Sequence, residues 1–241
     1  MNVEELRRAF NLSETIVERV RRFNLERTAR LRDNETPVPF TDGAKIVLQL
    51  IPILSFDVAQ RYDIDRIASH SEKMSPIYTA SWNHRYNLDG FVTFDADEGG
   101  NSYSYVQLYR NGIMEAVNAS LLKPWHDQTT YIPNIMYEQE LIKSLRVYLS
   151  LLQGISVELP IFIFMDLIGV KGYIMAVDRS RFALHGYAID RDSLLLPEVI
   201  VEKYDVKAEN ILKPCFDSIW NACGFSRSMN YNDKEEWSPP R

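Results

Sequence analysis

The chain has 241 residues, of which 46% are hydrophobic and 25% charged, and its formal net charge is −6. This composition excludes collagen, coiled coils, low-complexity disorder and disulfide scaffolds, and the length suffices for a core without covalent staples. The acidic balance argues against a protein whose whole surface binds nucleic acid, although it allows a local basic patch.

Residues 1–35 are predicted to form an arginine-rich helical segment, with Ser13 as an N-cap. Residues 1–40 contain eight arginines and seven carboxylates, so the rest of the chain carries the negative charge. The outward arginines fit either a solvated face with i,i+4 ion pairs or contacts to phosphates. A stripe at helical spacing comprises Ile16, Val17, Val20, Phe23 and Leu31. The candidate binding residues are Arg19, Arg21, Arg22, Arg27 and Arg30.

The prolines and Gly43 in residues 36–43 end this segment and lead to a body that we place at residues 44–224. Residues 44–51 form a dense apolar run with β-branched side chains, which predicts a mostly buried strand. The stretch 56–85 has no clear period and is predicted to be irregular, with one short helix at 63–70.

The clearest local signal is a hairpin at Asn111-Gly112, a pair that favours a two-residue type I′ turn. Counting outward from that turn sets Leu108 opposite Glu115 and makes Arg110 a diagonal neighbour of Glu115, close enough for an ion pair. With a further strand at residues 88–95, the region is predicted to be a three-stranded antiparallel meander.

Two helices are predicted for the body. Residues 136–153 have apolar side chains at helical spacing and Gly154 just beyond them as a cap. Residues 211–223 form the second helix, with Pro214 in its first turn and Gly224 as its cap.

The second half also contains strands. Residues 160–177 predict either one strand kinked at Gly169 and Gly172 or two strands in a hairpin. A further strand at 193–201 contains Pro197, which places it at a sheet edge or a bulge. The fold class is therefore α+β, with a mixed, largely antiparallel sheet, packing helices and the arginine-rich helix.

The sequence favours a cytoplasmic protein. The N-terminus lacks a secretory signal, and the most apolar stretch, residues 159–170, is too short to span a membrane. If their segment is helical, Cys215 and Cys223 are about 12 Å apart, too far for a disulfide, so they are expected to be free core thiols. Residues 225–241 are polar and are predicted to be a flexible tail.

The sequence lacks the motifs of several classes of enzyme. The chain has no phosphate-binding P-loop, no dinucleotide fingerprint and no Gly-x-Ser-x-Gly elbow. Its four histidines are scattered, without the spacing of a zinc site: His70, His84, His126 and His185. We therefore expect neither a metal nor a cofactor.

Weak catalytic candidates are carboxylates and one lysine. Asp166 interrupts an apolar run, so it is either a partnered carboxylate with a shifted pKa or a residue that meets Lys171 or an arginine at the sheet edge. Glu198, Asp205 and Lys207 resemble the acidic pair and lysine of metal-dependent nucleases, while Asp205 also fits a helix N-cap.

A second group of residues favours binding. Arg85, Tyr105, Tyr109 and Arg110 gather on the meander, where they could stack on bases, meet a peptide or form the rim of a core. A small-molecule sensor would need a deep pocket lined by such tyrosines.

Several segments together resemble the region that follows the DNA-binding module in bacterial Schlafen-like, Alba-type putative DNA-binding proteins. They cover most of the chain in order: Glu18–Arg21, Glu35–Pro39, Arg85–Gly90, Gln107–Gly112, Leu194–Val199 and Phe216–Ala222. The resemblance implies an accessory domain of prokaryotic nucleic-acid-associated proteins, in phage defence or regulation. The chain begins at the helix that would follow the module, so no active-site residue is carried over.

The sequence thus favours a non-enzymatic binding or assembly module. We expect a protein partner or a nucleic-acid-binding module on another chain, with nucleic acid and a further copy as other partners, and no membrane. The alternatives are a metal-dependent nuclease and a small-molecule sensor domain.

Overall fold

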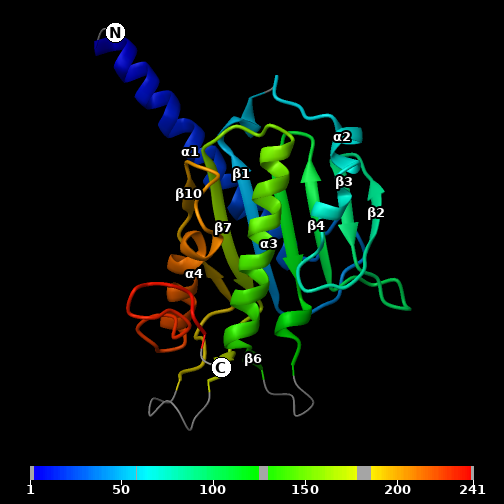
Figure 1. The fold of residues 1–241 in the computed structure, drawn as a ribbon, viewed down its shortest axis with the longest axis vertical. Coiled ribbons are helices and arrows are strands. Elements are labelled where there is room, and N and C mark those ends of the chain that lie inside the picture. Colours follow the sequence, from blue (N-terminus) through cyan, green and yellow to red (C-terminus); the bar gives the residue numbers. More distant parts are fainter. Residues whose placement is uncertain (1–2, 58, 125–129, 178–185, 240–241) are drawn as a thin grey trace.

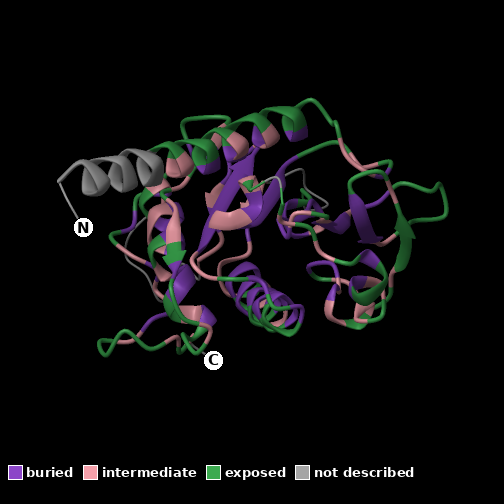
Figure 2. Ribbon diagram, turned by 90° about the horizontal axis from the view of Figure 1, so that it is seen from above, coloured by how far each residue is buried: buried purple, intermediate pink, exposed green. Residues whose placement is uncertain are grey.

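A computed structural model describes residues 3–57, 59–124, 130–177 and 186–239, and for residues 3–14 it describes the backbone alone. The fold is α+β, as predicted, and has three layers (Figures 1 and 2). Helix α1 (Val3–Arg32) lies on one face of a central sheet. Helices α3 (Asn134–Gly154) and α4 (Ala208–Ala222) cover the other face.

Within the described residues, the central sheet has eight strands, and every neighbouring pair is antiparallel. Across the sheet the order is β10 (Val199–Val201), β7 (Ile161–Ile168), β1 (Lys45–Pro52), β5 (Met114–Asn118), β4 (Ser104–Tyr109), β3 (Gly90–Phe94) and β2 (Asn83–Tyr86), with β9 (Ser193–Leu195) also paired to β7. A separate parallel pair joins β6 (Tyr131–Ile132) and β8 (Ile174–Met175). The remaining elements are α2 (Ile64–Ala68) and the 3-10 turns η1 (Ile53–Phe56), η2 (Ser71–Lys73) and η3 (Ser120–Leu122).

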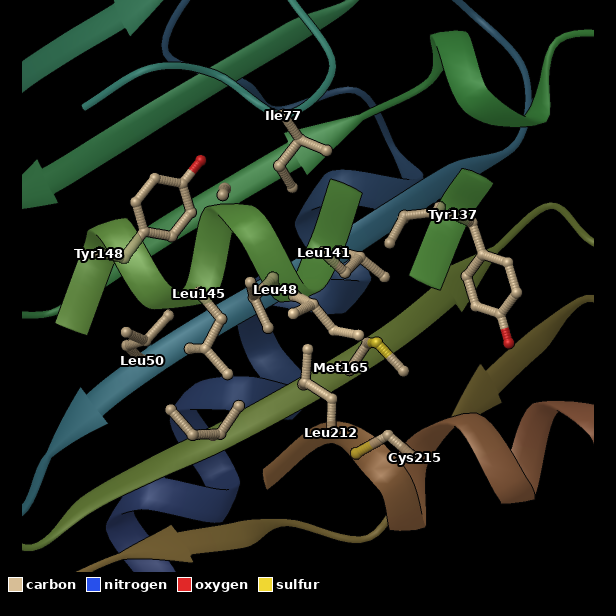
Figure 3. Packing of buried hydrophobic residues seen from close by; sticks show 14 of the residues in the cluster. Leu48, Leu50, Ile77, Tyr137, Leu141, Leu145, Tyr148, Met165, Leu212 and Cys215 are labelled. Atoms are coloured by element: carbon tan, nitrogen blue, oxygen red, sulfur yellow. The ribbon is translucent and has the colours of Figure 1, made fainter. Parts of the chain in front are cut away.

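The face under α3 and α4 holds the larger apolar core. Leu141 and Leu145 of α3 are fully buried and pack with Leu48 of β1 and Met165 of β7 (Figure 3). Burying a leucine side chain contributes about 1.5–3 kcal/mol, so this face alone supplies much of the apolar stabilisation. Cys215 of α4 belongs to the same core, and both cysteines are free and buried, as predicted.

The ends of α1 and α3 differ from the sequence expectation. Helix α1 begins at Val3 and continues through Ser13, so the N-cap predicted at Ser13 is wrong. Helix α3 includes Gly154, and the left-handed residue that follows it is Ser156, at φ +64°.

Helix α4 begins earlier than predicted. Lys207 is its N-cap residue, without a side-chain cap bond, so Asp205 is not the cap. The earlier start moves Pro214 from the first turn into the second, whereas Gly224 caps the helix at φ +87°, as predicted.

The β4–β5 hairpin contains the predicted Asn111-Gly112 pair but has a three-residue loop. The Tyr109 N–H donates to the Ile113 carbonyl at 2.8 Å, and the Gly112 N–H donates to the Tyr109 carbonyl at 3.0 Å. Gly112 has φ +87°, while Asn111 is not among the residues with positive φ. A type I′ turn needs positive φ at both positions, so the turn is instead type I followed by a left-handed glycine.

The longer loop shifts the register by one residue. Leu108 lies opposite Met114, not opposite Glu115. A one-residue shift turns every side chain to the other face of a sheet, and it places Glu115 beneath α1. The predicted ion pair between Arg110 and Glu115 is therefore wrong.

The other strand predictions are partly confirmed. The segment 160–177 forms two strands in different sheets, β7 and β8, and not a hairpin. The strand at 193–201 does lie beside β7, and Pro197 sits in a bulge there: three residues between β9 and β10 oppose two residues of β7. Strand β2 falls in the stretch predicted to be irregular, so the meander has four strands.

Residues 226–239, predicted to be flexible, fold onto the body. The buried carboxylate of Glu138 accepts hydrogen bonds from Trp220 Nε1 at 2.8 Å, Ser228 Oγ at 2.7 Å and Trp237 Nε1 at 2.9 Å. Burial raises the pKa of Glu138, although these hydrogen bonds oppose the shift. One carboxylate of α3 therefore bonds to the tail at two points, Ser228 and Trp237.

Candidate functional site

Helix α1 rests on the sheet through two apolar contacts with a polar interval between them. Val20 is buried against Ile51 of β1, and Leu31 is buried with Val47 of the same strand. Three polar side chains lie between these contacts: Asn24, Arg27 and Thr28. Together with the sheet residues that they meet, they form what we call the polar seat of α1: Asn24, Arg27, Thr28, Gln49, Tyr105, Glu115 and Asp166.

The centre of the polar seat is a two-point ion pair between Arg27 and Glu115. Arg27 Nε donates to Glu115 Oε2 at 2.9 Å, and its terminal nitrogen donates to Oε1 at 2.8 Å. The Tyr105 hydroxyl and the Gln49 amide donate to the same carboxylate at 2.8 and 3.0 Å. The Glu115 side chain is fully buried, so all its oxygen capacity is used inside the protein.

This arrangement fixes the charge states of its members. Burial alone would lower the pKa of Arg27, but the hydrogen bonds and the charge of Glu115 outweigh it and raise that pKa above its ordinary value. Burial and the neighbouring carboxylate raise the pKa of Tyr105, which stays protonated and donates. The centre of the polar seat therefore carries one positive and one negative charge.

Asp166 of β7 is buried at the other side of the seat. Its Oδ2 accepts hydrogen bonds from Asn24 Nδ2 at 2.8 Å and Thr28 Oγ1 at 3.1 Å, while its Oδ1 accepts the Leu196 N–H at 3.1 Å. No cation among the described residues pairs with it, so the alternative of a partner at Lys171 or an arginine is wrong. Burial raises the pKa of Asp166, and its three donors oppose that shift.

Arg21 links α1 to the edge of the sheet. Its Nε donates to Glu198 Oε1 at 2.9 Å, and a second guanidinium nitrogen contacts the same oxygen. Burial would raise the pKa of Glu198, but the hydrogen bonds and charge of Arg21 prevail and lower it. Since 55% of the Arg21 side chain is exposed, this pair is a surface interaction of modest strength.

Four of the five α1 arginines predicted to bind are exposed: Arg19, Arg21, Arg22 and Arg30. The closest carboxylate oxygens to Arg22 and Arg30 belong to Glu26 and Glu35, each at 3.9 Å, beyond normal hydrogen-bond distance. Arg21, although exposed, and the largely buried Arg27 pair with carboxylates of the body.

The predicted binding residues of the meander do not form one surface. Tyr105 is fully buried, and Arg85 lies over the ring of Phe94, with its guanidinium bonded to the Pro37 carbonyl. Arg110 lies at the hairpin and donates to the Leu88 carbonyl at 3.1 Å. Tyr109 packs edge-on against Phe23 of α1. Tyr105 is thus a buried core residue, whereas Tyr109 is the last residue of β4 and Arg110 lies in the hairpin loop after it.

The three residues proposed as weak nuclease candidates lie in two different segments. Glu198 is engaged by Arg21 in the bulge, and Asp205 and Lys207 are exposed in the turn before α4. Among the described residues, no three His, Cys, Asp or Glu side chains form a group that could hold a metal ion. His126 and His185 lie outside the described residues.

The sequence did not indicate that four residues of the polar seat lie together: Asn24, Thr28, Gln49 and Glu115. A signal for the first two was present, because polar residues interrupt the apolar stripe where it faces the sheet. The misplaced hairpin register hid Glu115, because it turned that side chain toward the wrong face of the sheet.

Among the described residues, no helix combines the length and the apolar composition that crossing a bilayer requires. Comparisons with protein-family models, with curated proteins and with solved structures found no match.

Proposed function

We propose that this protein is a non-enzymatic binding or assembly module of a nucleic-acid-associated system, and that α1 is its contact element. The observation that carries the proposal is the placement of α1. Its second half is anchored by the polar seat, and its first half extends beyond the edge of the sheet (Figure 1). A 30-residue helix is about 45 Å long, and the described side chains on the outer side of its anchored half include exposed arginines.

The accessible arginines favour the phosphates of nucleic acid as the contact. Arg19, Arg22 and Arg30 lie on the side of α1 that faces away from the sheet, where every third or fourth residue shares a face. Arg27 is largely buried against Glu115 and cannot reach a phosphate, and Arg21 is held by a short contact to Glu198. Arg22 and Arg30, by contrast, are exposed and lie 3.9 Å from their nearest carboxylates. The proposal therefore assigns contact to Arg19, Arg22 and Arg30, and scaffold roles to Arg21 and Arg27.

The test measures binding of short labelled single-stranded and duplex DNA and RNA by fluorescence anisotropy across a salt series. Replacing Arg19, Arg22 and Arg30 together by glutamine is expected to weaken binding and to reduce the slope of log K against log salt by about 0.7–0.9 for each lost phosphate contact. The matched control replaces three exposed arginines elsewhere: Arg66, Arg146 and Arg191.

The control variant changes net charge by the same amount, so it reports the effect of overall charge alone. Equal loss in both variants, or no binding of any nucleic acid by the wild-type protein, would overturn direct phosphate contact. In that case α1 would remain a candidate contact for a partner protein.

A further inference from the structure

The outer edge of β2 is open to another chain. Strand β2 is the last strand of the central sheet, and among the described residues no strand pairs with its outer side (Figure 1). All four of its residues, Asn83–Tyr86, are exposed. A free strand edge is a template on which another chain can pair, and proteins usually protect such edges. An edge that is left open is therefore a candidate interface.

The hydrogen-bond pattern of the β2–β3 hairpin shows which backbone groups face outward. Asn87 and Gly90 exchange two backbone hydrogen bonds, at 3.0 and 3.3 Å. Bonded and non-bonded pairs alternate along an antiparallel ladder, so Arg85 is bonded to β3, whereas His84 and Tyr86 are not. The N–H and C=O groups of His84 and Tyr86 therefore point away from the sheet. Among the described residues, none of these four groups has a hydrogen-bond partner.

One face of this edge is aromatic. The rings of His84 and Tyr86 lie on the same face, and both contact the buried ring of Phe91, at centroid distances of 5.5 and 5.2 Å. Tyr86 nevertheless remains 54% exposed. Aromatic and β-branched side chains stabilise one another as cross-strand neighbours. An added strand with β-branched residues opposite His84 and Tyr86 would cover these rings.

The other face of the edge carries a positive charge. The Arg85 guanidinium lies 5.9 Å from the centre of the Phe94 ring and bonds to the Pro37 carbonyl, so it lies over the sheet. In the part of the chain that the structure describes, no carboxylate pairs with it. In an added antiparallel strand, the residue opposite Arg85 belongs to a non-hydrogen-bonded pair, in which side chains approach most closely. A carboxylate at that position is therefore favoured.

The same arginine disfavours pairing with a second copy of this chain. A two-fold antiparallel pair that uses all four outward groups would set His84 of one copy opposite Tyr86 of the other. It would also set the two Arg85 side chains opposite each other. Like charges directly opposite destabilise a sheet. The edge is therefore better suited to a different chain than to itself.

We propose that the edge of β2 binds an extended segment of another protein, which adds an antiparallel strand to the sheet. This segment has an acidic residue opposite Arg85, between two β-branched residues opposite His84 and Tyr86. In strand addition the backbone hydrogen bonds provide affinity and the side-chain pairs provide specificity. The site is separate from α1 and independent of the phosphate contact assigned to it.

The experiment titrates the peptide acetyl-Thr-Val-Glu-Val-Thr-amide into the isotopically labelled protein and follows the backbone amides by NMR. Shifts are expected in Asn83–Tyr86, and the amides of His84 and Tyr86 should become protected from hydrogen exchange. The matched peptide has lysine in place of glutamate, and it is expected to bind about three- to tenfold more weakly. A third peptide carries N-methyl groups on both valines; it lacks the required donors and is not expected to bind.

Variants locate the site. Arg85→Glu is expected to reverse the preference between the two charged peptides, whereas Arg191→Glu, an equal change of charge beside β9, should preserve it. His84→Pro removes an outward N–H and leaves the hydrogen bonds between β2 and β3 in place. It is expected to weaken binding of the glutamate peptide about two- to tenfold, with little change in Tm.

Four results would each overturn the proposal. They are absence of binding of the glutamate peptide, equal binding of the N-methylated peptide, an unchanged preference in Arg85→Glu, and dimerisation of the protein through β2.

Discussion

The two faces of the sheet are covered in different ways. Under α3 and α4 the contacts are almost entirely apolar, with leucine, isoleucine and methionine side chains from both layers. Under α1 two smaller apolar clusters flank a seat that contains two buried carboxylates, Glu115 and Asp166. The same sheet therefore presents a hydrophobic face and a hydrogen-bonding face.

The difference concerns specificity more than strength. Apolar burial has no preferred direction, so α3 can adjust its packing when a side chain changes. The Arg27–Glu115 pair needs a defined geometry, and a buried ion pair that loses one partner leaves an uncompensated charge. We infer that the polar seat fixes the position and direction of α1, and hence where its first half projects.

The largest effect is expected from Arg27→Met, which leaves Glu115 as a buried anion without its cation. We expect a loss of about 3–5 kcal/mol in the free energy of unfolding, measured by urea denaturation. Arg21→Met, on the same helix, is the matched control; it breaks an exposed ion pair and should cost about 0–1 kcal/mol. Similar losses in the two variants would remove the distinction between a buried seat and a surface contact.

The apolar face should respond to shape and not to polarity. Leu145 is fully buried in α3, so Leu145→Ala is expected to cost about 2–5 kcal/mol through the cavity that it leaves. Leu145→Met conserves volume and should cost less than about 1.5 kcal/mol. Both values come from urea unfolding. A larger loss for Leu145→Met than for Leu145→Ala would show that this face is as geometrically demanding as the other.

The smallest expected effect is the contribution of Asp166 to the pH dependence of stability. Its pKa is raised by burial, so the folded state binds the proton more tightly than the unfolded state does. Stability from this group therefore falls as the pH rises from about 4 through the folded-state pKa. Asp166→Asn removes the titration, so the unfolding free energy of the wild type relative to this variant should decline as the pH rises above about 4. A constant or rising difference would contradict the raised pKa.

Much of the local structure was predictable from the sequence. The helical spacing in residues 136–153, the apolar run at 44–51 and the glycine after α4 each reflect the chain within a few residues, and each is confirmed. The α+β class followed from them. The register of the β4–β5 hairpin was not predictable, because Asn111-Gly112 is compatible with a two-residue or a three-residue loop.

The candidate site depended on contacts that local patterns do not contain. Arg27 was identified as a charged residue of an arginine-rich helix, but its partner lies 88 residues away on β5. The sequence by itself determined that α1 is a helix with one apolar stripe and several arginines. Only the tertiary structure decided which arginines are engaged by the body, because Arg27 is buried against Glu115 and Arg21, although exposed, pairs with Glu198, while Arg19, Arg22 and Arg30 lie exposed on the outer side of α1.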